Sequence, residues 1–189
     1  MHSKEPNIAT SAILTAPPLA ALRRVARILA FTLFTAVGAQ LAIRLPFTPV
    51  PLTMQTVFVV LAGMTLGARD GFYAMLSYLA AGLAGAPVFA GFGFGPAALI
   101  GPTGGYLVAF PAAALVAGFA VEKLRGRFAP LVASAVGLSL ILLAGAAYLA
   151  LLSGASVGTV AAMAVLPFVP GELIKAVAAA GLAGARARS

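Results

Sequence analysis

Long apolar stretches separated by short charged or proline-rich segments form the dominant pattern along the chain. Six of these stretches approach the roughly 20 residues that a membrane-spanning helix needs; they are 25–43, 53–66, 72–86, 106–121, 128–152 and 171–185. The pattern predicts an all-α polytopic membrane protein with six transmembrane helices. We expect one domain over residues 23–189, preceded by a segment, 1–22, that lacks the charged-then-apolar pattern of a cleaved signal peptide.

Four segments that interrupt this pattern are expected to lack a membrane-spanning helix. Segment 45–53 holds three prolines, which remove backbone donors and favour extended backbone, so it is expected to be a stiff loop over a cavity. Segment 67–71 is expected to be a tight charged turn. Segment 87–96 alternates glycine with phenylalanine and predicts an outer or re-entrant loop packed on the bundle. Segment 157–166 is apolar but too short to cross a bilayer, which predicts a short surface helix.

The composition and charge agree with a membrane protein. Hydrophobic residues make up 62% of the chain and charged residues 8%, whereas a soluble domain carries about 25% charged residues. The net charge of +8 does not indicate a nucleic-acid-binding patch, because the basic residues lie between apolar stretches. Nine of them fall on one side of the predicted membrane: Arg23, Arg24, Arg27, Arg69, Lys123, Arg125, Arg127, Arg186 and Arg188. Since the opposite loops carry only Arg44, both termini are predicted to be cytoplasmic, in a multi-pass protein of the cell membrane.

Several classes of function find no support in the sequence. The chain has no cysteine and a single histidine, His2, so no metal centre or thiol chemistry is expected. No serine–histidine pairing, no paired carboxylates and no nucleotide-binding motif are present. The double glycine Gly104–Gly105 is not a phosphate loop, because the lysine and the strand of that motif are missing. We therefore expect no enzyme, no cofactor and no ATP hydrolysis by this chain alone.

A carboxylate and an ammonium three residues apart interrupt the last apolar stretch. Pro170 suits the first turn of a helix, and Glu172 and Lys175 would then lie on one face of that turn. An ionisable residue at membrane depth costs at least about 2.5 kcal/mol, which makes it a candidate functional residue. Two interpretations stay open. The two charges neutralise each other at the membrane surface with Lys175 snorkelling outwards, or they line a polar pocket.

The remaining polar candidates lie on the same predicted external side. Gln55 either bonds another helix or contacts a ligand, and the 101–106 corner offers either close helix packing or close backbone approach to a ligand. A pocket with one cation, one acid and many apolar walls suits a small amphipathic carboxylate, with Lys175 holding that carboxylate and Glu172 and Gln55 meeting N–H or C=O groups. The candidate substrate-binding residues are Lys175, Glu172, Gln55, Thr103, Gly104, Gly105, Tyr106, Thr48, Val50 and Thr53.

Three stretches resemble the signature segments of the BioY biotin transporter family. They read PFTPVPLTMQT over 46–56, GPTGGYL over 101–107 and PFVPGELIK over 167–175. The resemblance implies a six-helix substrate-binding S component of an energy-coupling factor (ECF) transporter, which captures biotin outside and works with a transmembrane coupling (T) subunit and two ABC-type ATPases. This chain has Glu172 where the family usually has aspartate, which shifts the reach of the charge. The resemblance also implies that small residues of the first helix dock the coupling subunit, which we place on Ala26 and Ala30.

Two other classes of function stay open at this stage. A proton-coupled secondary transporter of a small carboxylate could use Glu172, because membrane carboxylates relay protons. An intramembrane enzyme is the weakest alternative, since the sequence offers no nucleophile with an adjacent base. Biotin capture for ATP-driven uptake is the expected function.

Overall fold

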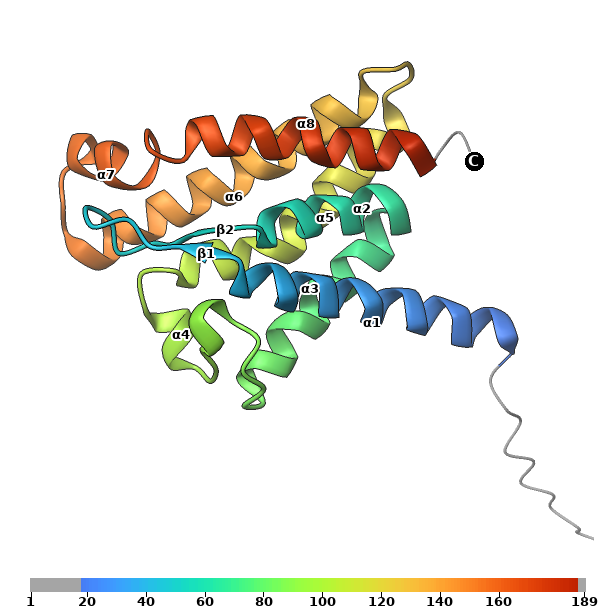
Figure 1. Cartoon of the computed structure of the whole chain (residues 1–189), viewed down its shortest axis with the longest axis horizontal. Coiled ribbons are helices and arrows are strands. Elements are labelled where there is room, and N and C mark those ends of the chain that lie inside the picture. The colour runs from blue at the N-terminus through green and yellow to red at the C-terminus, as the bar shows by residue number, and fades with distance from the viewer. Residues whose placement is uncertain (1–17, 187–189) are drawn as a thin grey trace, which may run out of the picture.

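The computed structural model describes residues 18–186, and over this range the protein is built from helices (Figure 1). The long helices are α1 (Leu19–Gln40), α2 (Gln55–Leu66), α3 (Ala68–Leu83), α5 (Gly104–Lys123), α6 (Ala129–Ser153) and α8 (Val169–Arg186). Shorter elements connect them: strands β1 (Ala42–Ile43) and β2 (Leu52–Thr53), the 3-10 turn η1 (Ala90–Phe92), and helices α4 (Ala97–Ile100) and α7 (Val157–Ala164). The all-helical architecture that the apolar pattern predicts is confirmed.

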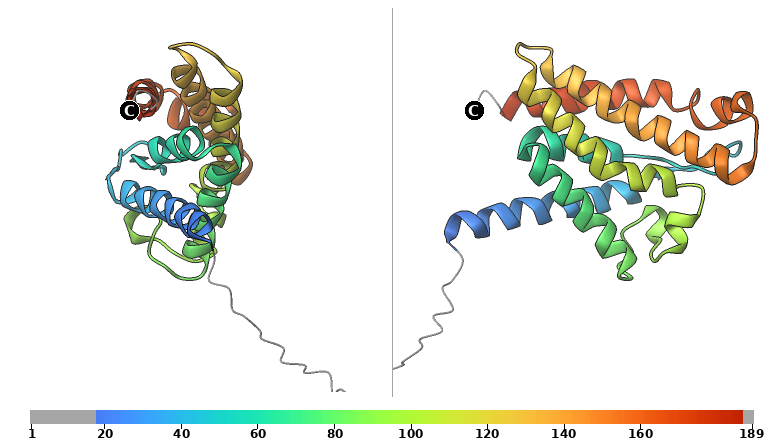
Figure 2. Two further views of the ribbon diagram at one scale, coloured as in Figure 1. Left: turned by 90° about the vertical axis from the view of Figure 1, so that its right-hand side faces the viewer. Right: turned by 180° about the vertical axis from the view of Figure 1, so that it is seen from behind.

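Helices α1 and α8 run along the long axis of the molecule, whereas α3 crosses this axis at a slant (Figure 1 and Figure 2). Helix α5 lies at the centre and packs against α2, α3 and α6, while α1 packs against α2 and α3, and α8 against α2 and α6. The largest fully buried side chains include Tyr78, Phe110, Met75 and Ile141. These residues come from α3, α5 and α6, so the core sits where the central helix meets its neighbours.

Three glycines bring the backbones of α2, α3 and α5 into direct contact. A Cβ atom on Gly63 would lie 2.0 Å from the carbonyl oxygen of Ala114, and one on Gly71 would lie 2.6 Å from the Cα of Gly63. A Cβ on Gly118 would lie 2.4 Å from the Cα of Ala68. These distances leave no room for any side chain, so glycine is required at this crossing of three helices.

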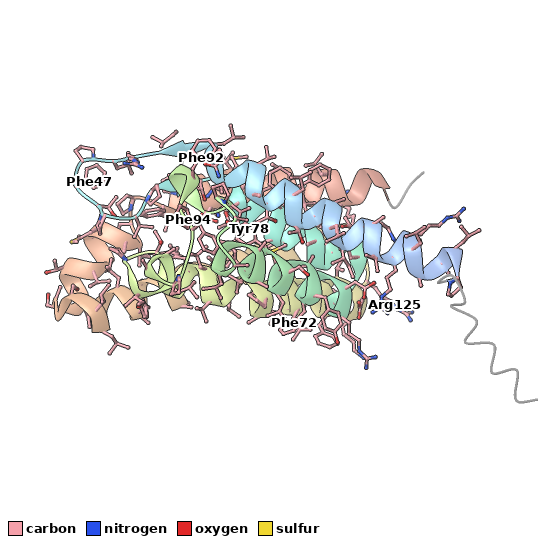
Figure 3. The ribbon with its side chains drawn as sticks, turned by 90° about the horizontal axis from the view of Figure 1, so that it is seen from below. Phe47, Phe72, Tyr78, Phe92, Phe94 and Arg125 are labelled. Atoms are coloured by element: carbon pink, nitrogen blue, oxygen red, sulfur yellow. The ribbon has the colours of Figure 1, made fainter. Side chains whose placement is uncertain are left out.

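One end of the bundle gathers the basic residues. The guanidinium of Arg24, near the start of α1, lies 2.6 Å from the carboxylate of Asp70 in the first turn of α3. The backbone N–H of Ala68 donates to Oε1 of Glu122, near the end of α5, at 3.0 Å. Arg125 marks this end in Figure 3, whereas Phe47, Phe92 and Phe94 lie toward the other end. The two contacts therefore join the starts of α1 and α3 and the end of α5, which the charge pattern predicted to lie on the same side of the membrane.

Several local predictions need correction. Gly104 and Gly105 are the first two residues of α5 rather than a corner, and neither has a positive φ. Segment 67–71 is not a turn, because Gly67 alone separates α2 from α3 and takes the positive φ (89°) that favours glycine. Segment 45–53 is not a loop throughout, because its last two residues form β2, which pairs antiparallel with β1; residues 45–51 are the tip of this β-hairpin.

The helix boundaries also differ in places. Helix α1 begins at Leu19, so the predicted N-terminal segment 1–22 ends inside a helix, and its first seventeen residues lie outside the described range. Pro170 lies in the first turn of α8, as predicted. The predicted surface helix over 157–166 is present as α7, which buries Val160 and Ala164.

Membrane-spanning length is clear for part of the bundle. Within the described residues, α5 and α6 are long and apolar enough to cross a bilayer. Helices α7 and α8 form a third candidate if the pair, bent by 51°, counts as one broken span. Helix α2 is apolar but has 12 residues, about 18 Å of helix. The count of six spans stays a prediction.

Candidate ligand-binding site

A cavity of about 590 Å³ lies at the opposite end of the bundle from the basic segment 122–127 (Figure 3). Its walls come from the starts of α2, α5 and α8, the middle of α6, the hairpin that contains residues 44–53 and the segment around η1 and α4. Segments far apart in the sequence therefore meet here. The volume falls within the roughly 300–1,000 Å³ typical of small-molecule sites.

Eight of the ten candidate residues from the sequence line this cavity: Lys175, Glu172, Gln55, Thr103, Tyr106, Thr48, Val50 and Thr53. Gly104 and Gly105 do not line it. A Cβ on Gly104 would lie 1.8 Å from the carbonyl oxygen of Leu99, and one on Gly105 would lie 2.2 Å from the Cβ of Tyr148. The two glycines thus allow α5 to pack closely against the chain around α4 and against α6.

The pair Glu172–Lys175 lies at a buried wall of the cavity. The ammonium of Lys175 donates to Oε1 of Glu172 at 2.7 Å and to the hydroxyl of Thr56 at 3.1 Å. Lys175 is 5% exposed, so the interpretation in which it snorkels outwards is wrong. Glu172 Oε2 is buried and accepts no hydrogen bond from the described part of the protein. A buried carboxylate oxygen without a partner is costly, and a ligand N–H would satisfy it.

Gln55 is held at the cavity by a chain of hydrogen bonds. Thr53 Oγ1 donates to Gln55 Oε1 at 3.0 Å, and Gln55 Nε2 donates to the hydroxyl of Tyr78. That hydroxyl donates in turn to the carbonyl oxygen of Val88 at 2.9 Å. The geometry agrees with both interpretations of Gln55, because its side chain bonds another helix, α3, and also lines the cavity where a ligand could contact it. An amide has two N–H groups and two acceptor positions, so one of each remains for a ligand.

The structure adds residues that the sequence analysis did not name as candidates. Thr56 holds Lys175 and could have been suspected, because it follows Gln55 directly. Arg44 lines the cavity. It could have been named from the sequence, because it is the one basic residue in the loops predicted to be external. The apolar walls include Phe89, Phe110 and Phe168. Phe89 and Phe168 lie in the segments 87–96 and 167–175 that the sequence singled out, whereas nothing distinguished Phe110 from the rest of its apolar stretch.

Arg44 and Lys175 differ in how their charges are compensated. Lys175 is matched by Glu172 at 2.7 Å. Arg44 is solvent-exposed, and none of the ion pairs in the described part of the chain includes it. Its Nη2 would lie 2.8 Å from a Cβ on Gly91, so the guanidinium rests against the backbone of η1. The cavity therefore has a compensated charge pair at a buried wall and an uncompensated cation toward the solvent.

The two residues proposed for partner docking lie on α1, away from this cavity. Ala26 is exposed and Ala30 is partly exposed, one helical turn apart. Larger apolar side chains on the same helix are also exposed, including Leu22, Val25 and Leu29. The geometry thus leaves part of α1 uncovered within the described structure.

Fold and site together define a small helical membrane protein with a ligand cavity at one end. Comparison with known proteins identifies its relatives. The BioY family model matches residues 8–189, and the chain belongs to the BioY family.

Individual relatives agree with this assignment. The chain is 41% identical to the probable biotin transporter BioY of Pyrococcus horikoshii, covering 83% of this chain and 91% of that protein. It is 42% identical to the biotin transporter BioY of Thermotoga maritima, covering 81% and 89%. The fold is similar to the crystal structure of the S-component for biotin from an ECF-type ABC transporter, with a TM-score of 0.85 and 26% identity over 92% of this chain and 95% of that one.

Proposed function

We propose that the protein is a biotin-binding S component, which captures biotin at the external face for ATP-driven uptake by an ECF transporter. The observation that carries the proposal is the cavity of about 590 Å³ with a buried Glu172–Lys175 pair, found in a chain of the BioY family. Coupling to ATP is assigned to separate subunits, a T subunit and ABC-type ATPases, with Ala26 and Ala30 on the docking face. The sequence itself carries no nucleotide-binding motif.

The proposed topology has six spans, both termini in the cytoplasm and the cavity facing outwards from the cell membrane. The support is the charge distribution, because Arg24, Arg69 and the 122–127 segment belong to one end of the bundle. Basic residues accumulate on the cytoplasmic side of membrane proteins. The hairpin tip over 45–51 and the segment of η1 and α4 then form the external cover of the cavity.

The polar groups of the cavity match the two ends of biotin, a ureido ring and a carboxylate. The sequence favours Lys175 as the partner of the carboxylate, but that ammonium already has Glu172 and Thr56 as acceptors. We therefore assign the ureido ring to the buried wall, where Glu172 Oε2 and Gln55 are available. The carboxylate then faces Arg44, whose charge has no partner among the described residues. The phenylalanine walls cover the apolar part of the ligand.

Replacing Lys175 tests the function and the site together. Lys175→Ala leaves the Glu172 carboxylate buried without its cation, and truncation of one member of a buried pair costs about 2–5 kcal/mol in binding. We expect biotin affinity, measured by titration calorimetry on purified protein, to fall by at least about 30-fold. Lys123→Ala removes the same side chain at the basic end and should leave the affinity unchanged. Equal biotin affinity in Lys175→Ala and the unmodified protein would reject the site.

The orientation of biotin can be tested with biotinamide, in which a neutral amide replaces the carboxylate. With the carboxylate facing Arg44, we expect biotinamide to bind about tenfold more weakly than biotin, because a charged hydrogen bond is lost. In Arg44→Gln the two ligands should bind alike. If Arg44→Gln still prefers biotin and only Lys175→Met loses the preference, the carboxylate lies at Lys175 instead.

The unpartnered oxygen of Glu172 keeps one alternative in view, a proton-coupled secondary transporter of a small carboxylate. Such a transporter would use this carboxylate as its proton carrier. Biotin uptake by cells that express this chain without T subunit and ATPases distinguishes the two functions. Uptake that a protonophore abolishes would support the alternative, and uptake only with the partner subunits and ATP would support the S component.

A further inference from the structure

A second concave surface lies at the basic end of the bundle, far from the biotin cavity. It is a groove of about 440 Å³ between the start of α6 and the second half of α8. The loop between α5 and α6 lies beside the end of α8 in Figure 1 and in the rear view of Figure 2. Its lining residues are Arg127, Phe128, Pro130, Leu131, Val177, Ala180, Gly181 and Gly184. No residue of this groove belongs to the proposed site for biotin.

The groove combines one polar end with an apolar floor. Arg127 stands at the polar end, with its guanidinium carbon 4.7 Å from the centre of the Phe128 ring. From Gly184 back to Val177 the floor follows α8 toward the middle of the bundle, over seven residues or about 10 Å. A Cβ on Gly181 or Gly184 would meet no atom within 4 Å. The missing side chains therefore leave an open channel that no described part of the chain fills.

Charge at the polar end is strongly one-sided. Lys123, Arg125 and Arg127 lie within five residues of one another, and the ion pairs of the described residues include none of the three. The one acid in this segment, Glu122, uses a carboxylate oxygen to accept the N–H of Ala68. The positive end of the α6 helix dipole lies at the same place and has no side-chain cap. This end of the groove therefore favours an anion.

We propose that the groove between α6 and α8 binds an anionic phospholipid, with the phosphate group on Arg127 and its basic neighbours and an acyl chain along Gly181. In a membrane, the occupant of a groove at a helix end must be ionic at the interface and apolar further in. An anionic lipid has both parts in that order, and basic pockets between helices are known to bind such headgroups. The inference rests on membership of a membrane-protein family and is independent of biotin binding.

The experiment uses the purified full chain in a neutral detergent. Dioleoyl phosphatidylglycerol and dioleoyl phosphatidylcholine, which share their acyl chains, are titrated separately, and bound lipid is counted by native mass spectrometry. We expect one saturable site that prefers phosphatidylglycerol by about fivefold or more, as loss of one interfacial charge contact would change binding by roughly that factor. The lack of any preference for the anionic lipid would overturn the proposal.

Paired variants separate the groove from general attraction to a basic surface. Arg127→Gln should weaken phosphatidylglycerol binding by about fivefold, whereas Arg69→Gln, the same change on an exposed arginine of α3 at the same end, should not. Gly181→Leu fills the channel and should weaken both lipids, whereas Ala178→Leu introduces the same side chain at an exposed position outside the groove and should weaken neither. Equal effects of the two arginine variants, or none from Gly181→Leu, would contradict the site.

A helix of the coupling subunit is the alternative occupant of this groove, and photo-crosslinking distinguishes it from a lipid. A photo-crosslinking residue at Leu131 in the assembled transporter should give lipid adducts under our proposal. Adducts to the coupling subunit in place of lipid would show that a protein occupies the groove and would overturn the proposal. Neither outcome depends on whether biotin is bound.

Discussion

The glycine crossing of α2, α3 and α5 and the cavity proposed to bind biotin show two opposite kinds of packing in the same apolar bundle. At the crossing, Gly63, Gly71 and Gly118 let backbones touch, and there is no free volume. At the cavity, the proline-rich hairpin and irregular loops line an open space, and polar groups with unused hydrogen-bonding capacity converge there. We infer that the close packing at the crossing offsets the free-energy cost of the open cavity and its buried, unsatisfied polar groups.

The largest effect is expected from filling the crossing. Gly63→Ala places a methyl group 2.0 Å from the carbonyl oxygen of Ala114, and a backbone atom cannot rotate away as a side chain can. Overpacking of this kind costs about 3 kcal/mol, which corresponds to a decrease in melting temperature of roughly 6–12 °C for a chain of this size. Circular dichroism of the purified protein during heating measures it.

Gly181→Ala is the matched control, because a Cβ there meets nothing within 4 Å. We expect no loss of stability, since alanine favours helix over glycine by about 1 kcal/mol. If Gly63→Ala melted at the same temperature as Gly181→Ala, the crossing would not be the rigid region, and the comparison would fail.

The residues of the cavity could be predicted from the sequence more fully than those of the glycine crossing. The cavity could be predicted because its residues are exceptional in this chain: Glu172, Lys175 and Gln55 are polar in apolar stretches, and three prolines mark the hairpin tip. The three polar residues and two of the three prolines, Pro49 and Pro51, line one cavity in the structure. Burial of polar groups is costly, so their presence in such a sequence carries information.

The crossing could not be predicted for the opposite reason. The chain has 21 glycines, and nothing local separates Gly63, which touches another helix, from Gly181, which faces open space. For the double glycine at 104–105 the sequence left close helix packing and close approach to a ligand both open, and the structure shows close packing, of Gly105 against Tyr148 of α6 and of Gly104 against Leu99. Which glycine is packed depends on helix positions that one sequence does not specify.

An intermediate effect is expected from Tyr78→Phe, which acts on the link between the two regions. The variant keeps the buried ring but removes the hydroxyl that accepts from Gln55 and donates to Val88. Leaving these buried groups unsatisfied costs about 2 kcal/mol. Because Gln55 loses the bond that orients it, we expect biotin affinity to fall by about tenfold as well. Titration calorimetry and thermal unfolding measure the two effects.

Tyr73→Phe provides the control, since Tyr73 is 48% exposed and lies on the same helix. It should change neither biotin affinity nor the melting temperature. If Tyr78→Phe lowered stability while biotin affinity stayed as in Tyr73→Phe, the orientation of Gln55 would not matter for binding, and the cavity would depend on the core less closely than we infer.

The smallest effect is expected at the basic end, where Glu122 closes the start of α3. Its Oε1 accepts the N–H of Ala68, the first residue of that helix, at 3.0 Å, which replaces the missing side-chain cap at Gly67. Loss of a cap costs about 1 kcal/mol, so Glu122→Ala should melt roughly 2–4 °C lower. Glu122→Gln keeps an acceptor oxygen and should retain most of that stability.

Biotin affinity should be unchanged in both variants, because the cap lies at the opposite end from the cavity. A loss of biotin affinity in Glu122→Ala would mean that the basic end and the cavity move as one unit, against the division proposed here.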